Sequence, residues 1–397
     1  MADAFSWQQW RQWRLEKRRD ALNDTTLFFN FRSYYLNRDK FDQTTSEAWA
    51  AGGWAGVRTG YFLDRFAFGL TGYTSQRLEG DEDEDGTLLL APGQDSYSVL
   101  GELYTDVRIL DGLNLSAGRK GFDTPFINRD DTRMTPNTFE AVVLHGKTEL
   151  TDGAEFNYGA GYFDQIKNRD SDEFISMAAD AGASVDRGVY SVGGLYQQEN
   201  FSIGGIDYFC DDTINIAYLE AKLAIPLVDD WKLNLATQYV DQSSVGEELS
   251  PDGDFITRQF GIKAELPVGD ALFTAAYTHG SGDANLQNPW SGYPGYTAVQ
   301  VQNFNREGED AFLLRAGYDF APVDGLSAYA LSVFGTKPDQ VGEYRQNEYN
   351  INLQWAPPEG IMKGFSLRLR YALAEQFGGD DETLTDFRVI CNYAFEF

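Results

Sequence analysis

The chain has 397 residues and a formal net charge of −29, with 12 Pro, 40 Gly and 15% aromatic residues. This charge excludes a nucleic acid as partner, because a polyanion would be repelled at long range. Nowhere does the sequence offer the roughly 20 consecutive apolar residues of a transmembrane helix. No linker divides the chain, and its first residues lack a secretory signal, so we expect one domain in mature numbering with an added or retained Met1.

The N-terminal stretch 5–19, FSWQQWRQWRLEKRR, differs in composition from everything after it. Trp7, Trp10 and Trp13 recur every three residues among five arginines and lysines. Two interpretations stay open: a short interfacial helix on the periplasmic rim, or a disordered tail. We assign residues 1–24 to an N-terminal periplasmic segment and residues 25–397 to the main domain.

From Thr25 onward, apolar and polar residues alternate with the period of two that is typical of β-strands. Eighteen segments show this pattern: 25–37, 47–62, 65–77, 95–109, 113–121, 138–149, 154–164, 187–197, 201–210, 213–225, 229–241, 254–266, 270–280, 309–320, 325–335, 343–355, 364–376 and 383–397.

The connections between these segments alternate in length. Short turns rich in Asp and Gly occur at 110–112, 151–153, 228–230, 268–270 and 322–325. Long polar loops occupy 78–94, 122–137, 165–186, 242–253 and 281–308. Short turns at one end, long loops at the other and an even strand count predict an all-β fold, an 18-stranded antiparallel transmembrane β-barrel of the outer-membrane type. A soluble all-β receptor is the weaker alternative.

The last segment predicts where the barrel meets the membrane surface. Its apolar face ends in Tyr393, Phe395 and Phe397, which with Trp355 should form an aromatic girdle at the periplasmic side, where both termini should lie. Cys210 and Cys391 fall on strands nine and eighteen, on opposite sides of a closed barrel, so we expect no disulfide between them.

Acidic runs at 79–86 and 378–382 carry much of the negative charge. We interpret them as solvated loop tips; the alternative is binding of divalent cations near the outer lipid surface. Their spacing defines no metal site, and no cofactor is predicted.

A barrel of eighteen strands leaves an aqueous lumen, so its inward residues should decide what passes. The alternation turns Arg32, Arg368, Arg370 and Arg388 inward on strands 1, 17 and 18, which are neighbours in a closed barrel. Such a row of guanidinium groups suits a carboxylate handed from one bidentate contact to the next. The alternative is that each arginine pairs with a nearby acid such as Asp386. Lys120 and Lys263 also face inward but stand apart.

Several longer motifs are similar to the OprD family of outer-membrane substrate-specific porins: 31–39 (FRSYYLNRD), 128–142, 288–311, RLRYA and FRVICNYAF. The resemblance implies a monomeric or weakly trimeric barrel with its third and seventh extracellular loops folded inward as a constriction. It implies a basic ladder of Arg32, Arg368, Arg370 and Arg388 for solutes with a carboxylate. It also implies Arg133, Tyr296 and Asn303 at the constriction.

The sequence therefore predicts a passive outer-membrane channel for small solutes that bear a carboxylate, surrounded by outer-membrane lipid and lipopolysaccharide. A sugar-selective or general diffusion porin is the first alternative, although the predicted inward residues are mainly small, polar and charged rather than aromatic. An outer-membrane hydrolase is the second. It would need a histidine beside a serine and an acid, and the only histidines are His145 and His279.

Overall fold

The computed structural model describes residues 7–227, 231–338, 343–378 and 382–397. Its helices are α1 (Trp7–Asn23) and α2 (Met177–Asp180), with 3₁₀ turns at Glu82–Glu84, Thr151–Gly153 and Gly360–Met362. Its strands are β1 (Thr26–Asp39), β2 (Thr45–Arg58), β3 (Phe66–Glu79), β4 (Tyr97–Leu110), β5 (Leu113–Lys120), β6 (Thr138–Glu149), β7 (Glu155–Lys167), β8 (Ile175–Ser176), β9 (Val189–Gln198), β10 (Phe201–Cys210), β11 (Ile214–Pro226), β12 (Lys232–Ser244), β13 (Ile256–Val268), β14 (Ala271–Gly282), β15 (Asp310–Asp319), β16 (Leu326–Gly335), β17 (Arg345–Trp355), β18 (Phe365–Phe377) and β19 (Glu382–Glu396). The turn expected at 228–230 and residues 379–381 of the second acidic run lie outside the described residues.

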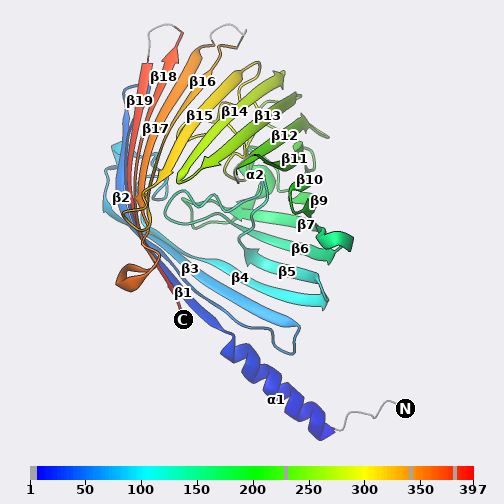
Figure 1. The fold of residues 1–397 in the computed structure, drawn as a ribbon. Coiled ribbons are helices and arrows are strands. Elements are labelled where there is room, and N and C mark those ends of the chain that lie inside the picture. The colour runs from blue at the N-terminus through cyan, green and yellow to red at the C-terminus, as the bar shows by residue number, and fades with distance from the viewer. Residues whose placement is uncertain (1–6, 228–230, 339–342, 379–381) are drawn as a thin grey trace.

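The strands close into a ring. Each pairs antiparallel with its neighbour, β7 pairs with β9, and β1 pairs with β19 from Phe28 opposite Glu396 to Asp39 opposite Thr385 (Figure 1). The two-residue β8 pairs only with the end of β7 and stays outside the ring. The predicted closed antiparallel barrel of eighteen strands is therefore confirmed. Closure satisfies every strand edge, which a sheet surrounded by lipid requires.

The two faces of the wall differ as the alternation predicts. On β1, Leu27 and Phe31 expose 47% and 53% of their surface on the outside, whereas Tyr34 and Leu36 on the inner side are buried. Phe29 stacks on Phe395 across the closing strand pair, with ring centroids 5.1 Å apart. The outer wall is thus an apolar and aromatic surface, while Tyr34 and Leu36 on the inner side pack against Leu89, Leu90 and Met134 of the loops.

Two local expectations can be compared directly with the structure. Cys210 on β10 and Cys391 on β19 are free thiols, as expected for strands that are far apart in the ring. The N-terminal stretch forms the helix α1 rather than a disordered tail over the residues described. No helix in the described part of the chain combines the length and apolar character needed to cross a membrane.

The main apolar cluster lies on the inner side of the ring. It joins inward residues of β6, β7, β10, β11 and β12 to side chains from the loop 121–137, from α2 and from the loop 283–309. Phe126 of the first loop contacts the rings of Tyr208, Tyr218 and Tyr293, with centroids 6.2, 6.2 and 6.4 Å away. These loops are therefore anchored to the wall by a packed aromatic core.

Candidate solute channel

Loop 121–137 contacts opposite sides of the ring. At one end of its contacts, Asp131 pairs with Arg32 on the inner face of β1, with an N–O distance of 2.6 Å. At the other, the amide of Phe126 donates to the hydroxyl of Tyr208 on β10 at 3.2 Å. Strands β2 to β7 and β9 separate β1 from β10 on one side, and β11 to β19 on the other. The loop thus reaches across the interior.

Loop 283–309 makes a second crossing. Its Tyr296 hydroxyl donates to Glu220 on β11 at 2.8 Å, and Asn128 of the first loop donates to its Gly292 carbonyl at 3.1 Å. At its far tip, the Gln300 amide donates to Asp386 on β19 at 2.7 Å. The two loops therefore touch each other, and their far contacts reach the inner faces of β1 and β19.

The tip of the second loop is held by a buried carboxylate. Glu348 on β17 is fully buried and accepts the amides of Val301 and Gln302 at 3.0 and 2.7 Å. Asn350 donates to the same carboxylate at 2.8 Å. Because the hydrogen bonds reach a charged group, they hold the tip more firmly than neutral bonds would.

The strand register brings the predicted arginines together. Arg370 on β18 lies opposite Arg388 on β19, and Arg32 on β1 lies opposite Asn392, to which its Nε donates at 2.6 Å. Arg368 is two residues from Arg370 and so shares its face. All four arginines stand on three neighbouring strands.

Two of the four already bind acids. Arg388 is buried and pairs with Asp386 at 2.5 Å, and it donates to the Gln300 carbonyl at 3.1 Å. Arg32 pairs with Asp131, donates to the Arg133 carbonyl and lies over the Trp54 ring at 5.0 Å. For Arg388 and Arg32, the contacts agree with the alternative that each arginine forms a structural ion pair with a nearby acid.

The other two have no acid beside them. Arg368 donates to the Asn352 amide oxygen at 2.5 Å, and Arg370 has a buried Nε without a hydrogen-bond partner. Among the residues that the structure describes, neither forms an ion pair. Their positive charge is therefore available to a ligand.

Arg133 adds a further cation from the loop 121–137. It is buried, and its guanidinium donates to the carbonyls of Thr87 and Thr132 at 2.8 and 3.0 Å without an acid among the described residues. Burial and the positive charge of Arg388 lower the pKa of Arg133. A cation with a lowered pKa gains stability from an anion placed beside it.

The remaining candidates lie away from this row. Lys263 on β13 sits over the Tyr296 ring at 5.1 Å, and burial together with the hydrogen bond to Glu220 raises the pKa of Tyr296. Lys120 on β5 pairs with Asp106 at 2.7 Å. Asn303 is exposed next to the tip of the loop 283–309.

Sequence reasoning missed several residues that shape the interior. Arg315 on β15 lies over the Tyr329 ring at 4.1 Å, and Tyr329 pairs with Asn352, the partner of Arg370. Alternation in AFLLRAGYD would have turned Arg315 inward. Inward tyrosines such as Tyr208 were also missed. The expectation that inward residues are mainly small, polar and charged was therefore incomplete. The rings of these tyrosines are buried under the loops.

The histidines stand on different strands, His145 on β6 and His279 on β14. His279 bonds to Asp310 at 2.9 Å, and no serine bonds to either ring within the described ranges. No group of three or more His, Cys, Asp or Glu able to hold a metal ion occurs among those residues.

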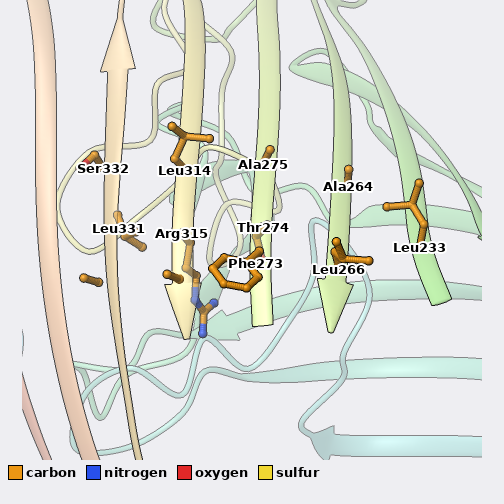
Figure 2. Close-up of a pocket in the computed structure, with 12 residues that line it drawn as sticks. Leu233, Ala264, Leu266, Phe273, Thr274, Ala275, Leu314, Arg315, Leu331 and Ser332 are labelled. Atoms are coloured by element: carbon orange, nitrogen blue, oxygen red, sulfur yellow. The ribbon is translucent and has the colours of Figure 1, made fainter. Parts of the chain in front are cut away.

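A hollow of about 500 Å³ lies along β12 to β16 (Figure 2). Most of its lining follows the outward alternation, including the exposed Phe273 and Leu314 and the alanines at 264, 275, 316 and 330. This hollow therefore belongs to the outer, apolar surface and not to the solute path.

A closed barrel with an apolar exterior and charged groups inside is the architecture of an outer-membrane channel. The chain belongs to the OprD family of outer membrane porins, whose family model matches residues 19–397. It is an integral outer-membrane protein, and the resemblance seen in its motifs is confirmed.

Solved structures of outer-membrane porins have the same fold. Pseudomonas aeruginosa OccK9 (OpdG) shares 23% identity at a TM-score of 0.85, covering 95% of this chain and 100% of its own. Acinetobacter baumannii OccAB3 shares 18% identity at a TM-score of 0.84, covering 94% of this chain and 100% of its own. P. aeruginosa OpdK, solved with vanillate, shares 20% identity at a TM-score of 0.81, covering 95% of this chain and 100% of its own. A comparison with curated proteins found no match.

Proposed function

We propose that this porin takes up small solutes bearing a carboxylate, and that Arg368, Arg370 and Arg133 draw the carboxylate through the constriction. The observation that carries the proposal is that these three cations have no acid partner among the described residues, although the chain is strongly acidic. If these cations served only in structural ion pairs, each of them would have an acid partner.

Local charge outweighs net charge in this setting. A permeating ion responds to charges within about 8–10 Å at ordinary salt, and a narrow, low-dielectric passage strengthens that response. Asp386 and Asp131 are already neutralised by Arg388 and Arg32, so the charges of Arg368, Arg370 and Arg133 stay unpaired among the described residues. The arginine row is therefore locally positive.

The two kinds of arginine have different roles in this mechanism. The unpaired guanidiniums of Arg368 and Arg370 attract the carboxylate and orient it through bidentate hydrogen bonds. Paired Arg388 offers a weaker contact because Asp386 and Gln300 already occupy its donors, so the solute is released rather than trapped. OpdK, a relative of the same fold, was solved with vanillate, which carries a carboxylate.

The reversal potential of the purified protein in a planar bilayer under a salt gradient tests the proposal. We expect anions to carry more current than the net charge of −29 implies, and a carboxylate such as benzoate to reduce the chloride current at low concentration. Strong cation selectivity without any effect of benzoate would exclude the guided-carboxylate mechanism.

A further inference from the structure

Helix α1 has a charge opposite to that of the whole protein. It contains five basic residues, at 11, 14, 17, 18 and 19, and two acidic residues, Glu16 and Asp20, in a chain of net charge −29. Most of it precedes residue 19, where the match to the family model begins. The channel mechanism makes no use of this helix.

The residues of α1 separate by chemistry around its axis. Arg11, Arg14, Leu15, Arg18 and Leu22 follow the i, i+3, i+4, i+7, i+11 spacing of a single helix face, on which Leu15 and Leu22 are 57% and 63% exposed. Arg14 lies over the Trp10 ring at 4.4 Å. The spacing i, i+4, i+8 places Gln12, Glu16 and Asp20 together on another side. One exposed face is thus cationic and apolar, and Trp10 lies at its edge under Arg14.

The barrel fixes the C-terminal half of the helix. Lys17 pairs with Asp64 at 2.9 Å, and the amide of Gly60 donates to the Ala21 carbonyl at 3.0 Å. Ala21 is buried in this contact. The helix is therefore attached to the turn between β2 and β3.

This attachment places α1 at the edge of the lipid-facing belt. Strand β1 begins three residues after the helix ends, and Leu27 exchanges backbone hydrogen bonds with Phe397 at the aromatic end of β19. Figure 1 shows α1 leaving the barrel at the end where the C-terminus lies. The helix thus starts at the level where lipid headgroups meet the barrel.

We propose that the Arg11–Leu22 face of α1, with Trp10 at its edge, binds anionic phospholipid headgroups of the membrane leaflet that faces the periplasm. Guanidinium groups bind phosphates bidentately, and tryptophan rings settle at the interface between headgroups and acyl chains. A basic helix is drawn to an anionic surface that repels the rest of this acidic chain. The occupant is therefore a phospholipid rather than a neutral surface.

The test uses the full chain in nanodiscs that contain either phosphatidylglycerol or only phosphatidylcholine. We expect amide hydrogen exchange over residues 10–22 to slow by about tenfold or more in the anionic discs, and high salt to reverse the effect. Brominated lipid should quench tryptophan fluorescence more strongly in those discs. The triple variant Arg11→Gln, Arg14→Gln, Arg18→Gln should lose both effects.

A matched triple variant, Lys147→Gln, Lys232→Gln, Lys363→Gln, removes the same charge from other parts of the barrel and should retain both effects. Heat-dependent migration on gels reports whether each variant has a folded barrel. Equal exchange in the two kinds of disc, or equal loss in both variants, would overturn the proposal. Binding to isolated peptidoglycan that needs the same arginines, without any lipid effect, would overturn it too.

Discussion

Replacing Arg370 with glutamine separates the channel mechanism from barrel stability. Its Nε has no hydrogen-bond partner and no acid depends on it within the described structure, so the change leaves no buried anion behind. A hydrogen bond to a charged group contributes about 1.5–3 kcal/mol, which equals roughly ten- to a hundredfold in affinity. We expect the benzoate concentration for half-maximal effect on current to rise by about that factor.

Arg388 should behave differently. Arg388→Gln removes the main partner of the fully buried Asp386 and leaves it with Arg38 at 2.7 Å. Breaking a buried pair costs about 3–5 kcal/mol, so this variant should lose stability as well as selectivity.

The assay is the reversal potential together with the benzoate titration in planar bilayers. Arg258→Gln serves as the control. Arg258 faces outward on β13, where it pairs with Asp241 of β12, and so lies away from the solute path. Its selectivity should equal that of the unmodified protein. If Arg370→Gln left both the reversal potential and the benzoate response unchanged, the unpaired guanidinium would have no part in permeation.

Three further predictions concern the loops. Glu348→Ala leaves the amides of Val301 and Gln302 without their acceptor, so single-channel current should become larger and noisier; a current trace equal to that of the unmodified protein would contradict the anchoring role. Deleting residues 128–134 should enlarge conductance and weaken solute discrimination, and unchanged conductance would place this loop outside the constriction. Burial raises the pKa of Asp180 in α2 to about 6. Because this folded-state pKa exceeds the unfolded value, stability is present at acid pH and is lost as the pH rises through about 6. The protection factors of the α2 amides, which correct for the pH dependence of intrinsic exchange, should therefore fall as the pH rises to about 6 and should change little with pH in Asp180→Asn.

The strands could be predicted because alternation and turn residues are local signals. The segment 201–210 coincides with β10, and 113–121 differs from β5 by one residue. The inward direction of Arg370 follows from the same alternation, and the closure of β1 on β19 places Arg32 near it. A sequence pattern with period two is sufficient for these features.

The partners of the site could not be predicted because the loops bring them from far along the chain. Arg32 and Asp131 are 99 positions apart, and Glu348 holds amides 46 and 47 positions away. Only the Arg388–Asp386 pair follows from the local sequence, because Asp386 lies two residues from Arg388 on the same face of β19. The contacts of Gln300 with both residues depend on where loop 283–309 ends its crossing.

The most direct measurement of the central claim is solute flux into liposomes that contain the purified protein. Benzoate and benzamide have nearly the same size and shape, but only benzoate has a carboxylate. The arginine row predicts that benzoate enters faster than benzamide, and that this preference disappears in the double variant Arg368→Gln, Arg370→Gln. Equal entry of the two solutes into liposomes with the unmodified protein would contradict the account.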